Sequence, residues 1–328
     1  MDDLSRLSFL SYFGGKQRLI KTILPLLPKH TLYVEVFGGS AAVLLNKPPS
    51  PVEVYNDIDR LLVNLFMVVR DHPREFARRV QSLPYSRLLY ERWQRQLKNG
   101  RLTGKQLEQA VRYYYMLRSS FFSHVEKGWR FATKTDEASR LYNSIGEVET
   151  IARRLQHVYL DHLDFRRCIR NWDRPDTFFF LDPPYFGTVP YRKGIKAFTA
   201  QDHEDLATLL RDVKGKWLLT YNDHPRIREL YASYGFKTVS TKLNTDMIPQ
   251  GQKRRSFPQL IIRNYGPKTV ANQGHTEGRS DQVRYRGDKL DVNELGPLTV
   301  FGTPFQATRA TVEGSRALKV ADGDESDG

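Results

Sequence analysis

A short turn of acidic, proline and aromatic residues follows one of the most apolar stretches of the chain. Residues 177–181 read TFFFL, and Asp182-Pro183-Pro184-Tyr185 come directly after them. Two successive prolines stiffen the backbone and remove two N–H donors, so the groups left for a ligand are the Asp182 carboxylate and the Pro183 carbonyl. With an aromatic ring beside them, these two acceptors suit a planar amine that has two hydrogens to donate.

Methyl transfer to such an amine poses a specific chemical problem. The lone pair of an exocyclic amine, such as that of adenine, is delocalised into the ring, which makes the nitrogen a poor nucleophile. Two acceptors that hold both hydrogens draw the nitrogen toward tetrahedral geometry, and positioning then supplies much of the rate of attack on the methyl group of a sulfonium. Cytosine N4, adenine in RNA and the glutamine side chain offer amines of the same kind, and the alternative interpretation of the segment is an ordinary turn.

A second group of candidate residues lies near the N-terminus. Residues 31–36 (TLYVEV) predict a buried strand, and Phe37-Gly38-Gly39-Ser40 follow it. Glycine lets a ligand approach the backbone closely, and Glu35 could hold a ligand ammonium group. Asp57 stands at the place where Rossmann-like folds bind ribose hydroxyls. The spacing is not GxGxxG, and the alternatives are a tight turn without a ligand and a helix N-cap at Asp57 or Asp59.

The elements that would position these residues alternate between strands and helices. In the first part of the chain we expect helix 17–27, strand 31–36, a helix capped by Ser40, strand 52–55 and helix 60–70. Later we expect strands 158–160, 177–181, 216–221, 236–240 and 259–264, with helices 199–213, which Thr199 would cap, and 225–234. This alternation predicts an α/β fold with a Rossmann-like, mostly parallel sheet and helices on both faces.

Residues 72–154 interrupt the alternation. Helical patterns run through 73–81, 86–98 and 103–117, and a polar, aromatic stretch with a loop or hairpin follows. This segment carries 17 Lys and Arg against 8 Asp and Glu, whereas residues 266–328 carry 8 against 10. We therefore expect a basic, mostly helical insertion at 72–154, a domain formed by 1–71 and 155–265, and a flexible tail at 266–328.

Composition narrows the class of protein. The net charge of +14 favours a polyanionic partner such as nucleic acid, although a basic protein without such a partner is the alternative. No apolar stretch approaches the roughly 18 residues of a transmembrane helix, and the N-terminus lacks the features of a signal peptide. The single cysteine, Cys168, excludes a disulfide framework, and the histidines show no metal-ligand spacing. We expect an intracellular protein without a metal.

Taken in order, these motifs resemble those of the Dam-type (alpha-group) DNA adenine-N6 methyltransferases, which depend on S-adenosylmethionine. The matching segments are Phe13-Gly14-Gly15-Lys16, 34–43 (VEVFGGSAAV), 55–59 (YNDID), Asp164-Phe165 and Asp182-Pro183-Pro184-Tyr185, followed by Phe198-Thr199 and Asp202. In that family the cofactor motifs come first, the target-recognition insertion next and the catalytic motif after it. The glycine turn departs from the FxGGG of many relatives, and nothing after Tyr265 matches the family.

The resemblance implies a role for each motif. Asp182, Pro183, Pro184 and Tyr185 would form the catalytic turn that holds a flipped adenine, because the amine is out of reach inside a duplex. Glu35 would hold the amino-acid part of the cofactor, Asp57 its ribose, and Asp164 and Phe165 its adenine. The residues expected to bind S-adenosylmethionine are Tyr12, Phe13, Gly15, Lys16, Glu35, Phe37, Gly38, Gly39, Asp57, Asp164, Phe165 and Asp182.

The resemblance also implies double-stranded DNA as the substrate and a cognate restriction endonuclease as a candidate partner, in the cytoplasm of a prokaryotic cell or a phage-infected one. Basic and aromatic residues interleave between 112 and 134, which suits phosphate contacts and wedging into a base stack. The residues expected to bind DNA are Arg118, Ser119, Ser120, Phe122, Arg130, Lys134 and Arg192. The alternatives are a methyltransferase for cytosine N4 or RNA adenine, an inactive DNA-binding relative, and an S-adenosylmethionine enzyme for a small metabolite.

Overall fold

The computed structural model describes residues 7–10, 16–100, 102–188, 194–244 and 256–266, all within one unit, Met1–Val270. Side chains are described at these positions except for Arg18, Phe122, 237–244 and 256–258. The predicted tail, from residue 267 onward, lies outside the described residues.

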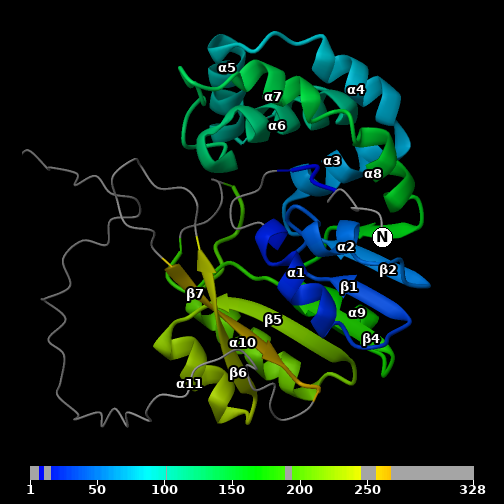
Figure 1. Cartoon of the computed structure of the whole chain (residues 1–328), viewed down its shortest axis with the longest axis vertical. Coiled ribbons are helices and arrows are strands. Elements are labelled where there is room, and N and C mark those ends of the chain that lie inside the picture. The colour runs from blue at the N-terminus through cyan, green and yellow to red at the C-terminus, as the bar shows by residue number, and fades with distance from the viewer. Residues whose placement is uncertain (1–6, 11–15, 101, 189–193, 245–255, 267–328) are drawn as a thin grey trace, which may run out of the picture. The chain divides into compact units, whose positions relative to one another are not determined.

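A seven-stranded sheet forms the centre of the described chain (Figure 1). In spatial order its strands are β3 (Val158–Asp161), β2 (Val52–Asn56), β1 (Leu32–Glu35), β4 (Thr177–Leu181), β5 (Lys216–Asn222), β7 (Ser256–Arg263) and β6 (Lys237–Asn244). The strands from β3 to β5 are parallel, and β7 is antiparallel to both β5 and β6. Each predicted strand is present, and the predicted Rossmann-like α/β fold is confirmed.

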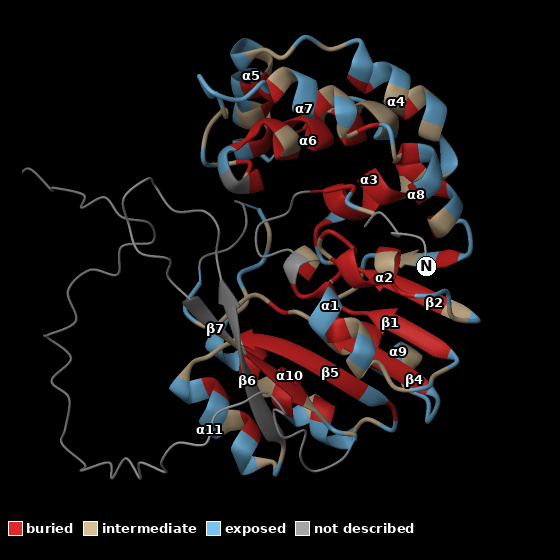
Figure 2. Cartoon of the chain, in the orientation of Figure 1, coloured by how far each residue is buried: buried red, intermediate tan, exposed pale blue. Residues whose placement is uncertain are grey.

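The central strands are buried because helices cover both faces of the sheet (Figure 2). Every residue of β1 and of β4 is buried. Neighbouring positions alternate between two cores, since Tyr33 and Phe178 belong to one hydrophobic cluster whereas Val34 and Phe179 belong to the other. A strand buried on both faces is apolar throughout, which explains the uninterrupted TFFFL run.

Each core is closed by its own set of helices. The cluster around Tyr33 includes side chains of α2 (Ala42–Asn46), α3 (Arg60–Asp71) and α8 (Val148–Leu155). The cluster around Val34 includes side chains of α9 (Phe165–Trp172), α10 (Ala200–Asp212) and α11 (Pro225–Ser233). Thr199 caps α10 in a capping box with Asp202, as the sequence predicted for this helix start.

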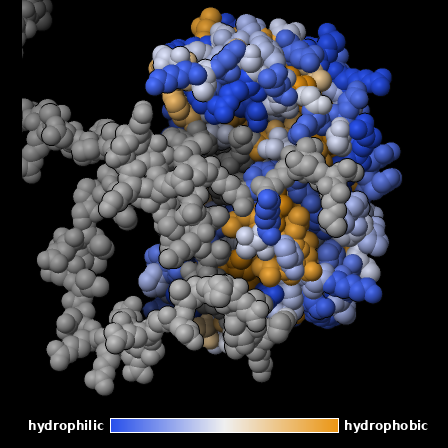
Figure 3. Space-filling model, viewed as in Figure 1, coloured by the Kyte–Doolittle hydropathy of each residue, from blue (hydrophilic) through white to orange (hydrophobic). Residues whose placement is uncertain are grey.

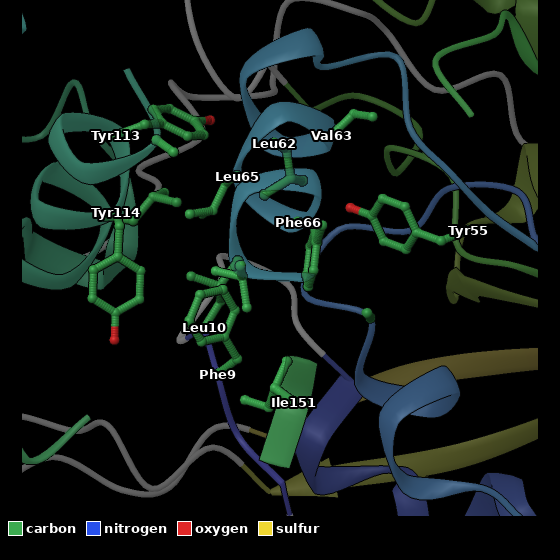
Figure 4. Close-up of a cluster of buried hydrophobic side chains, with 14 of the residues drawn as sticks. Phe9, Leu10, Tyr55, Leu62, Val63, Leu65, Phe66, Tyr113, Tyr114 and Ile151 are labelled. Carbon is green, nitrogen blue, oxygen red and sulfur yellow. The ribbon is translucent and has the colours of Figure 1, made fainter. Parts of the chain in front are cut away.

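The chain between α3 and β3 is mostly helical, as predicted. It contains α4 (Pro73–Gln81), α5 (Arg87–Lys98), α6 (Gln106–Ser119), η3 (Phe121–Ser123) and α7 (Glu137–Asn143), and it ends with α8. Helix α6 packs on α3, and Tyr114 stacks on Phe9 with ring centroids 5.1 Å apart (Figure 4). Between α6 and α7, Ser120 and Trp129 form an antiparallel bridge, so the predicted loop or hairpin is a short hairpin.

Three local expectations were wrong or incomplete. Instead of one helix over 17–27, the chain forms three short ones, η1 (Lys16–Arg18), α1 (Ile20–Ile23) and η2 (Leu24–Leu26). A continuous α-helix would need a backbone N–H donor at position 25, and Pro25 has none. Ser40 does not cap α2, because the N-cap position is taken by Ala41 in the left-handed conformation, with φ 55°. Helix α9 was not predicted, because only Phe165, Cys168 and Ile169 of its eight residues are buried.

An ionic cluster anchors the end of the insertion to the sheet. Glu53 on β2 is buried and pairs with both Lys47 and Arg154, and Arg154 Nη2 also donates to Leu44 O at 2.7 Å. Burial alone would raise the pKa of Glu53, but the hydrogen bonds and charges of the two cations outweigh it and lower the pKa. Separation of Arg154 from Glu53 would leave a buried charge without compensation. The cluster therefore anchors α8, which carries Arg154, to β2, which carries Glu53.

The Gly38→Ala variant is expected to destabilise the protein. A Cβ at this position would lie 2.1 Å from Cε2 of Tyr55, whose buried ring donates its hydroxyl to Gly39 O at 2.9 Å. Overpacking of this kind costs about 1–3 kcal/mol, which urea unfolding would detect as a lower free energy of unfolding. Gly146→Ala is the matched control, because its Cβ would meet Asn143 O at 3.4 Å. Equal losses in the two variants would contradict this explanation.

Candidate active site

A pocket opens beyond the carboxyl ends of β1, β2 and β4, where the strand order reverses on either side of β1. Ligands of open α/β sheets bind at this kind of switch point. The segments after β1, β2, β3 and β4 all contribute to its walls. The lining includes Lys16, Glu35, Phe37, Gly38, Gly39, Asp57, Asp59, Asp164, Phe165, Asp182, Pro184 and Phe198. The structure therefore brings together motifs that the sequence places far apart.

Asp182, directly after β4, is held by two side chains from other parts of the chain. Lys16 Nζ lies 2.6 Å from Asp182 Oδ2, and Thr220 on β5 donates its hydroxyl to Oδ1 at 2.8 Å. Burial raises the pKa of Asp182, whereas the charge and hydrogen bond of Lys16 and the hydrogen bond of Thr220 oppose that rise. The two donors therefore stabilise the carboxylate form and fix its orientation.

The rest of the proline turn places an aromatic ring beside this carboxylate. Pro183 is buried, Pro184 lines the pocket, and the Tyr185 ring centroid lies 5.0 Å from Lys16 Nζ. The Tyr185 hydroxyl is buried and has no hydrogen-bond partner among the described residues. Acceptors and a ring face thus lie within one rigid turn, as the sequence predicted.

Glu35, at the end of β1, is a buried carboxyl group in the pocket wall. Its Oε2 accepts hydrogen bonds from the Tyr33 hydroxyl at 2.9 Å and from the Leu44 N–H at 2.8 Å. Burial raises the pKa of Glu35 to about 8, in spite of these hydrogen bonds. The group is therefore mostly protonated at neutral pH, and a cation arriving beside it would favour its ionised form.

The glycine turn and the loop after β2 are tied together by Asp57. Its Oδ2 accepts from the Gly39 N–H at 2.9 Å, and its Oδ1 accepts from the Asp59 N–H at 2.7 Å. Asp59, not Asp57, caps α3, by accepting from the Leu61 N–H at 3.0 Å. Asp57 thus lines the pocket without serving as a helix cap, which leaves the predicted ribose contact as its candidate role.

Asp59 also connects the pocket to the helical insertion. The Tyr113 hydroxyl on α6 donates to Asp59 Oδ2 at 2.6 Å, and both side chains are buried. Helix α6 leads directly into the hairpin that begins at Ser119 and Ser120. This contact could not be predicted from the sequence, where Tyr113 is only one residue of a helix packing face.

At the far wall of the pocket, aromatic rings surround the start of α9. Asp164 caps this helix by accepting from the Arg166 N–H at 2.9 Å. The Phe165 ring lies 5.7 Å from Phe37 and 5.4 Å from Phe198, centroid to centroid. This wall offers a planar apolar face next to a carboxylate, which suits a purine.

The residues expected to face DNA do not all do so. Ser119 and Ser120 are fully buried, and their hydroxyls donate to Tyr115 O at 2.5 Å and Leu117 O at 3.2 Å. The expectation that these two serines contact DNA directly is therefore wrong for this conformation. Small hydroxyl side chains at the end of α6 instead let the hairpin pack closely on the helix.

Two of the expected arginines brace the hairpin from within. Arg130 donates to Arg118 O at 2.8 Å and pairs with Glu137 at 2.9 Å, while Arg118 Nη2 donates to Arg140 O at 3.4 Å. Burial lowers the pKa of Arg118. Lys134 is exposed. Tyr12, Phe13, Gly15 and Arg192 lie outside the described residues, as does the side chain of Phe122.

Two aromatic side chains are exposed at the hairpin, and an arginine that the sequence did not single out lies beside one of them. Phe121 and Phe131 are 37% and 55% exposed. The Arg87 guanidinium lies 5.0 Å from the Trp129 centroid and 5.3 Å from the Phe131 centroid. The surrounding helices present mostly hydrophilic surface in the view of Figure 3.

Neither a metal cluster nor a membrane helix is found in the described part of the chain. No three His, Cys, Asp or Glu side chains gather there in a way that would hold a metal ion. None of the helices described combines the length and apolar character that crossing a bilayer requires.

The doubly wound sheet, the glycine turn after β1 and the acidic proline turn after β4 together define a Rossmann-like methyltransferase domain. Residues 12–246 match the family described as D12 class N6 adenine-specific DNA methyltransferases, and the chain belongs to this family.

Two curated relatives are modification methylases. The chain is 24% identical to modification methylase StsI of Streptococcus sanguinis over an alignment of 292 residues, which covers 79% of this chain and 43% of the relative. It is 25% identical to modification methylase LlaI of Lactococcus lactis subsp. lactis over 210 residues, 62% of this chain and 33% of the relative. The chain thus spans less than half the length of these relatives.

The chain is also similar to a solved structure described as an RNA methyltransferase from Pyrococcus horikoshii. The superposition covers 75% of this chain and 80% of that chain, with a TM-score of 0.31 and 10% sequence identity. The fold assignment rests on the strand order and not on this likeness.

The Lys16→Met variant is expected to raise the pKa of Asp182 further, because it removes the cation that opposes the effect of burial. Titration of aspartate carboxyl carbons by NMR would measure this shift. Lys196→Met is the control, since Lys196 lines the same pocket but is exposed and lies 4.0 Å from Asp202. An unchanged titration of Asp182 in the Lys16 variant would contradict the role given to the ion pair.

Proposed function

We propose that this chain transfers a methyl group from S-adenosylmethionine to the N6 amine of an adenine extruded from duplex DNA. The observation that carries the proposal is the Asp182 carboxylate, which Lys16 and Thr220 hold at the edge of a pocket with acidic and aromatic walls. Family membership supports the same reaction class.

The pocket suits S-adenosylmethionine, judged by its own side chains. Glu35 is a buried carboxyl group with a raised pKa of about 8, a fitting acceptor for the ammonium group of an amino acid. Asp57 offers carboxylate oxygens to ribose hydroxyls, and Phe165 offers a ring face to a purine. When bound, this cofactor supplies an electrophilic methyl group on a sulfonium.

Asp182 and Pro183 would act on the target amine. The Asp182 carboxylate and the Pro183 carbonyl accept one N6 hydrogen each, which turns the nitrogen lone pair out of the ring plane. The Tyr185 ring holds the plane of the base by stacking. The charge of Lys16 favours the ionised form of Asp182, which offers one more acceptor oxygen than a protonated carboxyl group. After the transfer N6 must lose a proton, and the Asp182 carboxylate can accept it.

DNA is the substrate that the insertion suits. An adenine amine inside a duplex cannot reach a pocket at the edge of the sheet, so the base must be extruded. Phe131 on the exposed face of the hairpin is a candidate to occupy the space in the stack, and Arg87 and Lys134 are candidates for phosphate contacts. We assign DNA recognition to residues 72–154 and cofactor binding and catalysis to 1–71 and 155–265.

A restriction endonuclease is the proposed partner system, because both curated relatives are called modification methylases. Methylation of cytosine N4 remains the second candidate, since the proline turn holds any planar exocyclic amine.

The test incubates the purified chain with S-adenosylmethionine labelled on its methyl carbon and with unmethylated duplex DNA, RNA or protein. Chromatography of the digested nucleosides is expected to find the label in N6-methyladenine from duplex DNA. Label in N4-methylcytosine, or only in RNA or protein, would refute the proposal, as would DNA binding without any transfer.

Cofactor binding is expected to release close to one proton at pH 7. Glu35, with a pKa of about 8, is mostly protonated in the free protein and becomes ionised when an ammonium group lies beside it. Calorimetry of S-adenosylhomocysteine binding in buffers of different ionisation enthalpy measures this proton, which is expected to vanish above about pH 9 as Glu35 ionises beforehand. The Glu35→Gln variant is the control, and it is expected to release no proton when the ligand binds. A buffer-independent enthalpy for the unaltered protein would contradict the assignment of Glu35.

A further inference from the structure

An ionic cluster centred on Arg166 joins two walls of the proposed cofactor pocket. Arg166 is the second residue of α9, directly after Phe165. Its Nη2 lies 2.5 Å from Asp202 Oδ1 and 2.5 Å from Asp205 Oδ2, and its Nε lies 2.9 Å from the same Asp205 oxygen. Both aspartates belong to α10, so the guanidinium links the start of one helix to the start of another.

The α10 side of this link is itself rigid. Asp202 accepts from the Thr199 N–H at 2.8 Å and from the Thr199 hydroxyl at 2.7 Å, in the capping box of α10. Burial opposes ionisation of Asp202, but the hydrogen bonds from Thr199 and Arg166 outweigh it and lower the pKa to about 2. Phe198, whose ring contacts Phe165 at 5.4 Å, directly precedes this cap. The anchor for the guanidinium is therefore ionised and fixed at physiological pH.

The opposite edge of Arg166 faces the purine-binding candidates. Its Nη1 lies 3.4 Å and 3.3 Å from the two carboxylate oxygens of Asp164, and its guanidinium carbon lies 4.3 Å from the centroid of Phe165. These contacts to Asp164 are longer than an ordinary charge-assisted hydrogen bond of about 2.7–2.9 Å. The arginine thus orients the carboxylate while leaving lone pairs on its oxygens available to a ligand.

Arg166 supplies the positive charge that balances the carboxylates of this cluster. Three carboxylates, those of Asp164, Asp202 and Asp205, surround one guanidinium, and Lys196 reaches Asp202 only at 4.0 Å. Without the Arg166 guanidinium the three anions would repel one another at the pocket wall, and Asp164, 40% exposed, would keep only the hydrogen bond that it accepts from the backbone N–H at position 166.

We propose that Arg166 is a positioning residue that holds Asp164 and Phe165 in the geometry that selects a 6-aminopurine over a 6-oxopurine in the cofactor. This inference rests on the proposed function, because it takes the pocket to bind the adenosine part of S-adenosylmethionine. An ionised Asp164 can only accept hydrogen bonds, so it attracts the amine of adenine and repels the carbonyl oxygen of hypoxanthine. That selection requires the carboxylate to stay in place, which is what the anchored guanidinium provides.

The test compares S-adenosylhomocysteine with S-inosylhomocysteine, in which a carbonyl replaces the 6-amine of the purine and N1 carries a proton. Calorimetry gives the dissociation constant of each with the unaltered protein and with Arg166→Gln. Arg167→Gln is the matched control, because it removes the same charge from an exposed position of the same helix. The Asp164→Asn variant, which lacks the carboxylate, shows how the two ligands bind when the selection is lost completely.

The unaltered protein and the Arg167 variant are expected to bind the adenosyl ligand with a dissociation constant about tenfold lower or more. A hydrogen bond to a charged group contributes a preference of this size. In the Arg166 variant the preference is expected to fall toward that of the Asp164 variant, mainly through weaker binding of the adenosyl ligand. If the variant does not fold, Asp205→Asn, which loosens the anchor but keeps the guanidinium, is expected to reduce the preference in part.

Equal weakening of both ligands with the preference intact would overturn the inference, because it would give Arg166 a purely structural role. An unaltered protein that binds both ligands equally would overturn it as well, while leaving a pocket for this cofactor class. Failure of the unaltered protein to bind either ligand is a distinct outcome, which would refute the proposed function itself.

Discussion

The partly buried ion pair between Lys16 and Asp182 is the interaction on which the site depends. It joins residues 166 positions apart at a distance of 2.6 Å. A carboxylate taken out of water is costly unless an opposite charge and hydrogen bonds compensate it, and Lys16 and Thr220 offset part of that cost. The pair can form only when the segment before α1, the end of β4 and the middle of β5 are all in place, so the folded sheet itself assembles the acceptor.

Two carboxyl groups of the pocket, those of Asp182 and Glu35, have different neighbours. Asp182 has a lysine within hydrogen-bond distance, whereas Glu35 has a tyrosine hydroxyl and a backbone N–H and titrates with a pKa of about 8. The negative charge of Asp182 contributes to the raised pKa of Glu35. A ligand that brings a positive charge to Glu35 would therefore favour ionisation of this carboxyl group, and this links ligand binding to proton release.

Much of the fold and of the pocket could be predicted from the sequence, because the informative residues act locally. The TFFFL run must be a buried strand, and the proline turn after it lies at the edge of the sheet wherever that strand is placed. The capping box of α10 is likewise a local signal, in which Thr199 and Asp202 are three residues apart.

The remaining features depend on contacts between distant segments, which one sequence does not encode visibly. Thr220, Arg87 and Tyr113 acquire their roles from the pairing of β4 with β5, from packing of α5 on the hairpin and from packing of α6 on α3. For Ser119 and Ser120 the sequence suggested a contact that the structure does not support. Their polar side chains suggested DNA contact, but their hydroxyls donate hydrogen bonds to carbonyl groups of the preceding helix turn. Arg166 was not singled out from the sequence, because helix α9 was not predicted, and only its contacts with Asp202 and Asp205 set it apart.

The most direct measurement is the single-turnover rate of methyl transfer to duplex DNA by Asp182→Ala, with the binding of S-adenosylhomocysteine measured beside it. If the carboxylate at the end of β4 positions and activates the amine, the rate falls by about a hundredfold or more while the cofactor product still binds. Transfer to adenine at an undiminished rate in this variant would contradict the account.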